Sequence, residues 1–477
     1  MSTTASGQGS SSLLRKKDVD AMIAATKDGE GHLERSMGVF ALMMFGVGAT
    51  IGTGIFFVMA ETVPEAGPAV IFSFVIVGVI AGLTALCYAE VASTVPVSGS
   101  AYSYAMASLG ELPAYIVGWC LILEYGVAAS ATSVGWAEYF NELTDDVFGV
   151  RLPHSLSAGA LADDPGLVNL PAVVLVALCC VLLLRGAKES ARANAIMVCI
   201  KLGVLSLFIV IAAFGFTSDH FAPFAPHGFA GVAAALPPIF FTFIGLDACS
   251  TAGEEVKDPG RTIPRAIIGA LLIVVTFYVL VAAAALGAQQ AGMFEGQEAG
   301  LARILSDVTG SDIPAIILAA GAVVSVFSVT LVTIYGQTRI LFAMGRDGML
   351  PKMFKEVDPR TLGPNKNVLV TCLFVGLLAS TVPIDRLWDL VSIGTLAAFI
   401  VVSATVLILR RTRPDLERSF KVPFYPVLPI LSILACLWVA TKVPGETWLL
   451  VIAWLALALA LYAAYGRRHS VLAVTRK

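Results

Sequence analysis

Long runs of apolar residues, separated by short polar or Pro/Gly-containing connections, dominate the chain from Met37 onward. A helix that crosses the ~30 Å of bilayer hydrocarbon needs about 20 mostly apolar residues in a row, and about twelve stretches approach or exceed this length. Their approximate limits are 38–63, 68–95, 111–140, 170–185, 193–216, 231–256, 264–288, 313–342, 367–383, 388–409, 427–443 and 447–465. We therefore predict an all-α integral membrane protein with about twelve transmembrane helices.

The composition excludes the main alternatives to a membrane protein. Hydrophobic residues make up 57% of the chain and charged residues only 14%, whereas a soluble domain carries roughly 25% charged residues. The net charge of -3 predicts no nucleic-acid partner. The cysteines and histidines show no metal-ligand spacing, so we expect no metal or other cofactor.

The positions of the basic residues predict the orientation of the chain. Most of the 31 Lys and Arg residues fall on the side of the spans that carries both tails, and cytoplasmic loops are the ones enriched in Lys and Arg. The residues on the other side are Arg151, Arg303, Arg386 and Lys442. We expect a multi-pass protein of the cytoplasmic membrane with both termini in the cytoplasm, and with a polar, partly disordered N-terminal tail of about 35 residues.

Two of the predicted spans contain residues that disfavour a continuous helix. The first has four glycines near its middle, each of which costs roughly 1 kcal/mol relative to Ala in a helix. A break is expected near Ile51–Gly54. The sixth follows Pro237 and Pro238 and carries Gly245 and Asp247 at mid-depth, where a second break is expected. Broken spans five helices apart indicate an inverted repeat of five plus five helices, with a substrate site between the breaks.

Three sequence motifs carry a resemblance to a known family. They are GVGATIGTGIF (46–56), FIGLDACSTAGEEVKDPGRTIPRAI (243–267) and GQTRILFAMGRDGMLP (336–351). In this order they resemble signatures of the amino acid/polyamine/organocation (APC) transporter superfamily, in particular the bacterial relatives of the cationic amino acid transporters. The resemblance covers the chain from about residue 36 to 465 and implies a LeuT-like fold with broken helices 1 and 6.

The repeat pattern divides the chain into four predicted segments. These are a cytoplasmic tail (1–36), an inverted-repeat transport core of spans 1–5 and 6–10 (37–409), two additional helices (410–465) and a cytoplasmic tail (466–477).

The first break offers main-chain donors to an anion. If the helix unwinds here, the N–H groups that open its outer half lose their intrahelical partners and favour a carboxylate. The candidate residues are Thr50, Ile51, Gly52, Thr53 and Gly54. The alternative is a helix-packing face of small residues, with Gly48 and Gly52 four residues apart.

At the second break the polarity reverses. Carbonyl groups around Phe241 to Ile244 end the first half of the helix and are expected to receive an ammonium group. The resemblance implies that Phe241 and Phe243 flank the ligand, although aromatic residues at this spacing are also common in packing. Asp247 either caps the break or contacts the substrate. A carboxylate at one break and an ammonium at the other describe an α-amino acid.

Lys201, in the fifth span, is the candidate for coupling to protons. It lies nine positions beyond Arg192, hence roughly 13 Å deeper, too far to reach the membrane interface with ease. A buried ammonium must pair with an acceptor or lose its proton. The resemblance implies that this lysine replaces a sodium ion of sodium-coupled relatives, so a proton is the expected coupling ion and sodium is not expected. The alternative is a static ion pair with Asp247 or Glu124.

Two further residues are candidates for substrate contact. Glu124, near mid-membrane in the third span, either recognises a distal amine or relays protons, or is a hydrogen-bonded structural carboxylate. Thr333, in the eighth span, is a candidate for shaping the side-chain pocket. A group of charged residues near the cytoplasmic end is expected either in an inner gate or in a network of ion pairs at a helix end, or as solvated loop charges: Glu90, Glu254, Glu255 and Lys257.

Together these features predict a secondary active transporter that imports L-amino acids, with a proton, by alternating access. The alternative is an exchanger of amino acids or polyamines. No loop supplies the nucleophile and base of a membrane enzyme, so we expect no enzymatic activity. The expected partners are the L-amino acid and the lipid bilayer, and both a monomer and a complex with a small membrane subunit remain open.

Overall fold

The structure is a computed structural model, and it describes residues 15–24, 33, 35–150, 152–162, 164–295, 300–382, 384–441 and 445–474. Within these residues every element is helical, and the one β contact is an isolated bridge between Met37 and Val256. Seven of the described helices are long and apolar enough to cross a membrane, judged by length and composition. The all-α membrane class predicted from the sequence is therefore confirmed.

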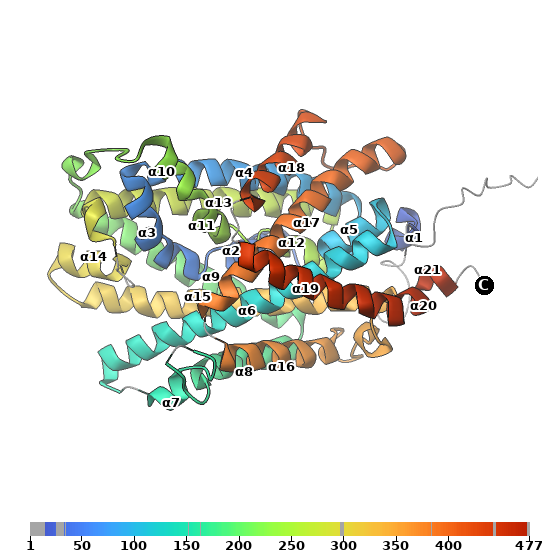
Figure 1. The fold of residues 1–477 in the computed structure, drawn as a ribbon, viewed down its shortest axis with the longest axis horizontal. Helices are drawn as coiled ribbons and strands as arrows, with labels where there is room; N and C mark the ends of the chain where they lie inside the picture. The colour runs from blue at the N-terminus through green and yellow to red at the C-terminus, as the bar shows by residue number, and fades with distance from the viewer. Residues whose placement is uncertain are drawn as a thin grey trace, which may run out of the picture.

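The long helices form one bundle, and most of them run along the long axis of the view in Figure 1. They are α4 (Val70–Thr94), α6 (Glu111–Phe148), α8 (Leu170–Leu184), α9 (Ala187–Phe214), α13 (Pro259–Ala288), α15 (Ile313–Arg346), α16 (Asn365–Thr381), α17 (Ile384–Thr412), α18 (Val427–Ala440) and α19 (Gly445–Leu461). The contacts of α6 with α15 and α17, and of α13 with α4, are the most extensive.

Shorter helices mark the two ends of the bundle (Figure 1). One end, which we call the terminal end, carries α1 (Val19–Ala24), α20 (Arg467–His469) and α21 (Val471–Val474). The opposite end carries α7 (His154–Ser157), α10 (Gly228–Ala234) and α14 (Gly300–Thr309). The sequence analysis did not predict α14, which lies in the connection between α13 and α15.

Both expected helix breaks are present. The first span consists of α2 (Val39–Thr50) and α3 (Thr53–Ala66), with the non-helical residues Ile51 and Gly52 between them. The sixth consists of α11 (Leu236–Thr242) and α12 (Ala248–Thr251), separated by five residues outside any helix. At the centre of the bundle α2 packs against α9, α13 and α15, while α11 packs against α3 and α4. The two breaks therefore lie inside the protein.

The outer surface of the bundle is apolar. On α16, for example, Leu369, Leu373 and Leu377 follow one another at four-residue spacing and are 54%, 73% and 60% exposed. Such an apolar stripe is unfavourable in water and suits contact with lipid.

Part of the N-terminal tail is folded against the terminal end, although its polar composition predicted a partly disordered tail. Val19 and Met22 of α1 are buried, and the N–H of Lys17 donates to the carbonyl of Met106. This packing depends on the bundle, which explains why the local composition did not predict it.

Candidate functional site

The two helix breaks meet at a small cavity in the middle of the bundle. Its volume of about 50 Å³ is several times the ~10–15 Å³ that one water needs. The lining residues come from both breaks and from α6, α15 and α17: Ala49, Thr50, Gly52, Gly54, Glu124, Tyr125, Ala128, Thr132, Thr242, Ile244, Gly245, Asp247, Ala248, Val329, Thr333 and Val391.

At the first break, the start of α3 faces the cavity. Gly52 is the N-cap residue, and no side chain caps the helix, so the first N–H groups of α3 have no intrahelical partner. A Cβ at Gly52 would lie 2.6 Å from Val329, so this close approach requires glycine. Thr50 and Gly54 also line the cavity, Ile51 is buried beside it, and the side chain of Thr53 lies outside the described part of the chain.

At the second break, the backbone crosses the end of α2. Gly245 has a φ of +109°, and a Cβ there would lie 2.7 Å from the carbonyl oxygen of Ala49. Ile244 and Asp247 line the cavity, and the side chain of Asp247 does not cap α12. Phe243 does not belong to the described lining and instead packs edge-on against Tyr278, with the ring centroids 5.1 Å apart. The side chain of Phe241 lies outside the described residues.

Lys201 joins α9 to the first break. It is fully buried, and its Nζ donates to the carbonyl oxygens of Gly48 (3.2 Å) and Ile51 (2.6 Å). Ser325 Oγ also donates to the carbonyl of Ile51, at 3.2 Å. Among the described residues no carboxylate forms an ion pair with Lys201, so the alternative of a static pair with Asp247 or Glu124 is wrong for this structure. The carbonyl oxygens at the end of α2 accept the hydrogen bonds of Lys201 in place of a carboxylate.

Two buried acids face the cavity from different elements. The hydroxyl of Tyr125 donates to Asp247 Oδ2 at 2.5 Å, and the hydroxyl of Thr395 donates to Glu124 Oε1. The second oxygen of each carboxyl group has no hydrogen-bond partner among the described residues. A buried acid with an open acceptor is costly, and both oxygens are available to a bound cation or proton. The described residues hold no group of three potential metal ligands.

Comparison with known proteins identifies the family. The profile of the amino acid permease family matches residues 37–464, which include both breaks and Lys201. The chain belongs to this family. The resemblance to the APC superfamily is thus confirmed, and the protein is a multi-pass membrane transporter rather than an enzyme.

Relatives of this permease are named for different substrates. A branched-chain amino acid permease of Bacillus subtilis (strain 168) is 44% identical over 97% of this chain and 99% of its own length. A methylthioribose transporter of the same organism is 39% identical over 97% and 99%. The vacuolar cationic amino acid transporter 4 of Arabidopsis thaliana is 34% identical over 85% and 68%.

Ion pairs close the terminal end of the permease. Arg339 Nε lies 2.8 Å from Glu255 Oε1, and both side chains are buried. Arg346 binds both oxygens of Glu254, at 2.8 and 3.0 Å. Glu90 is paired in the same way, with Arg410. The alternative of solvated loop charges is therefore wrong for these three acids, whereas Lys257 is exposed.

The N- and C-terminal segments extend this network. Lys17 Nζ lies 2.6 Å from Asp347 Oδ1, and Arg15 Nε lies 3.3 Å from Glu111 Oε2. Ser470 Oγ donates to the same Glu111 oxygen at 2.9 Å. Described residues near both ends of the chain thus bind acids at the ends of the core helices.

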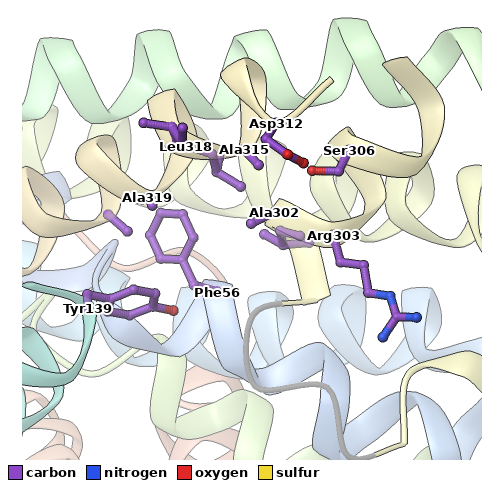
Figure 2. Close-up of a pocket in the computed structure, with 12 residues that line it drawn as sticks. Phe56, Tyr139, Ala302, Arg303, Ser306, Asp312, Ala315, Leu318 and Ala319 are labelled. Atoms are coloured by element: carbon purple, nitrogen blue, oxygen red, sulfur yellow. The ribbon is translucent and has the colours of Figure 1, made fainter. Parts of the chain in front are cut away.

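The opposite end of the permease contains a cavity of about 410 Å³ (Figure 2). Its walls come from α3, α6, α14 and α15. Figure 2 shows the rings of Phe56 and Tyr139 near one another at one side, with the guanidinium of Arg303 pointing away from them. Ala322 of α15 lines this cavity and Val329 lines the central one, a separation of about 10 Å along the helix.

Several lining residues were missed by the sequence analysis. Ala128 and Thr132 follow Glu124 at four-residue intervals, and Val329 precedes Thr333 by four. Residues four apart share one helix face, so this spacing is a signal that would have found them. The four-residue spacing does not identify Tyr125, which follows Glu124 directly, or Val391, which lies in a distant span.

Proposed function

We propose that this permease imports L-amino acids together with protons across the cytoplasmic membrane, by alternating access. In this proposal twelve spans include two inverted repeats of five helices, from the segments before and after residue 231, and both termini face the cytoplasm. The observation that carries the proposal is the meeting of the two helix breaks at one cavity, with a buried lysine bonded to the first of them.

The two breaks offer complementary main-chain groups to an α-amino acid. The uncapped start of α3 presents N–H groups to the α-carboxylate, and the carbonyl groups that end α11, including that of Thr242, present oxygens to the α-ammonium. Each missing group of a ligand would leave a buried main-chain group without a partner, at a cost of about 1–3 kcal/mol. Ligands that lack either group should therefore be excluded.

Lys201 supplies a mechanism for proton coupling. When the Lys201 amine is protonated, its hydrogen bonds hold the carbonyl oxygens of Gly48 and Ile51 beside α9. A neutral amine has fewer hydrogens to donate and no charge to offer those oxygens. Loss of the proton would therefore weaken the link between α2 and α9 and favour rearrangement of the broken helix.

The walls of the cavity favour aliphatic side chains. Val329, Val391, Ala128 and Ile244 are apolar, and Glu124 offers a single open carboxylate oxygen. A relative that shares 44% identity is named for branched-chain amino acids, which agrees with these walls. The relative named for methylthioribose shows that membership of the family alone does not decide the substrate. We therefore place L-leucine first, followed by L-alanine and L-lysine.

Uptake into proteoliposomes tests the proposal. Wild-type protein should accumulate radiolabelled L-leucine when an inward proton gradient is imposed, without sodium, and uptake should fall as the external pH rises. Lys201→Ala should still bind L-leucine, measured by calorimetry, because both breaks remain. It should lose gradient-driven accumulation by at least about tenfold, since the titrating group is gone.

Lys188→Ala is the matched control, because Lys188 lies on the same helix but is exposed. It should accumulate substrate as the wild type does. Wild-type uptake that requires sodium and ignores pH would contradict proton coupling. Accumulation that occurs only with amino acid loaded inside the vesicles would favour the exchanger.

A further inference from the structure

The hydroxyl group of Tyr278, on α13, lies between the two helix breaks. Its oxygen is 2.9 Å from the carbonyl oxygen of Thr50 and 2.8 Å from that of Thr242. The side chain is fully buried. Thr50 is the last residue of α2 and Thr242 the last residue of α11, so one side chain contacts the carbonyl ends of both broken helices.

The hydroxyl of Tyr278 has a single hydrogen, which limits how many hydrogen bonds it can donate. A phenol has one O–H hydrogen, so it cannot donate a full hydrogen bond to both carbonyls at the same time. The end of a helix leaves its last carbonyl groups without intrahelical partners, and a buried carbonyl without a donor is unfavourable. In this arrangement, one of the two oxygens always lacks the full bond and is open to another donor.

The ring of Tyr278 is held in place by packing rather than by its hydroxyl. Its centroid is 6.1 Å from that of Phe74 and 5.1 Å from that of Phe243, both in edge-to-face contact. It projects from α13, which is continuous from Pro259 to Ala288. The continuous helix α13 thus holds a hydrogen-bond donor in a fixed position beside the carbonyl ends of α2 and α11.

We propose that Tyr278 is a positioning residue for the substrate's ammonium group. Its hydroxyl holds the carbonyls of Thr50 and Thr242 at one place beside the cavity and shares its single hydrogen between them. When an ammonium group binds to one carbonyl, the hydroxyl donates to the other, so both are satisfied only in the occupied site. This inference rests on the proposed function and identifies a residue that acts on the same site.

The role of Tyr278 is separable from that of Lys201. Lys201 donates to Gly48 and Ile51, whereas Tyr278 donates to Thr50 and Thr242. Among the described residues, the two groups share no hydrogen-bond acceptor. Removal of the Tyr278 hydroxyl should therefore change substrate affinity and leave the pH dependence of uptake unchanged.

Tyr278→Phe tests the proposal because it removes the hydroxyl and keeps the ring. Tyr104→Phe is the matched control, since Tyr104 is equally buried and its hydroxyl has no hydrogen-bond partner among the described residues. The measurements are KM, maximal rate and pH profile for L-leucine, L-alanine and L-lysine in proteoliposomes, and the melting temperature without substrate. Tyr278→Phe should raise KM about tenfold, with less than about a threefold change in maximal rate.

A second variant restores a donor at the same place. With 4-aminophenylalanine in place of Tyr278, an N–H group again faces the carbonyls, and KM should return to within about threefold of the wild type. If Tyr278→Phe folds poorly, its KM cannot be measured, and the 4-aminophenylalanine variant is compared with the wild type instead. We then expect it to recover both folding and substrate affinity.

The possible results separate the two proposals. Wild-type protein that binds and transports none of the three amino acids would contradict the proposed function. Normal wild-type transport combined with equal KM values for Tyr278→Phe and Tyr104→Phe would overturn the role of Tyr278. A shifted pH profile in Tyr278→Phe would also overturn it, because the hydroxyl would then act through Lys201.

Discussion

The terminal and opposite ends of the permease are built from different interactions. At the terminal end, Glu255 and Arg339 are 2.8 Å apart, and their side chains are 0% and 4% exposed. At the opposite end, the ion pair between Arg303 and Asp307 spans 4.0 Å and more than half of each side chain is exposed. The terminal end is sealed by buried charges, whereas the opposite end holds a cavity of about 410 Å³.

This difference indicates which side of the site is closed. A buried ion pair cannot separate without leaving a charge that lacks its partner, so the terminal end opens only when the network rearranges as a whole. The opposite end is lined largely by apolar and aromatic side chains, which can move without exposing a buried charge. Buried ion pairs therefore hold the terminal end together, whereas the ion pair described at the opposite end is exposed.

The largest expected effect comes from the buried pair. Glu255→Gln leaves the guanidinium of Arg339 without its carboxylate, which should lower the free energy of unfolding by about 3–5 kcal/mol. Thermal unfolding of the purified protein in detergent measures the effect. The double variant Glu255→Leu/Arg339→Met should recover most of the loss, because it removes both charges. A loss below about 1 kcal/mol in Glu255→Gln would show that the terminal end does not depend on this pair.

A smaller effect is expected from the N-terminal segment. Lys17→Ala removes the 2.6 Å contact with Asp347, in which the lysine is 20% exposed, and should cost about 1–2 kcal/mol. It should also loosen the terminal end. In a cysteine-free background, a cysteine introduced at the buried Ser98 should then react several-fold faster with a membrane-impermeant maleimide on inside-out vesicles. Unchanged labelling would mean that this segment plays no part in closure.

The smallest effect is expected at the opposite end. Arg303→Gln removes an exposed pair at four-residue spacing, which should change the free energy of unfolding by no more than about 0.5 kcal/mol. The melting temperature should stay within about 1–2 °C of the wild type. If this variant lost as much stability as Glu255→Gln, the contrast between the two ends would be wrong.

The sequence predicted the position of the helix breaks because their cause is local. Glycines clustered in an apolar span weaken the helix wherever it lies, and Gly245 beside Asp247 does the same in the sixth span. The burial of Lys201 was also predictable, since its depth follows from its distance along the helix.

The partners of these residues were not predictable, because they come from remote parts of the chain. Lys201 was expected to pair with a carboxylate if it was static, yet it contacts carbonyl oxygens about 150 residues earlier. Tyr278 looks like any aromatic residue in an apolar span, and only the fold brings it to both breaks. Val19 and Met22 are buried by contacts that a polar local composition does not reveal.

The use of main-chain groups at the two breaks has a consequence for how substrate preference can change. A side-chain substitution cannot delete an N–H or a carbonyl group, so the main-chain groups that we propose as the receptors of the amino acid backbone are protected from most single mutations. The walls are not protected, because Val329, Val391 and Ala128 are ordinary side chains on three different helices. Under the proposed function, substitutions at a few wall positions can therefore change substrate preference while the main-chain groups stay the same.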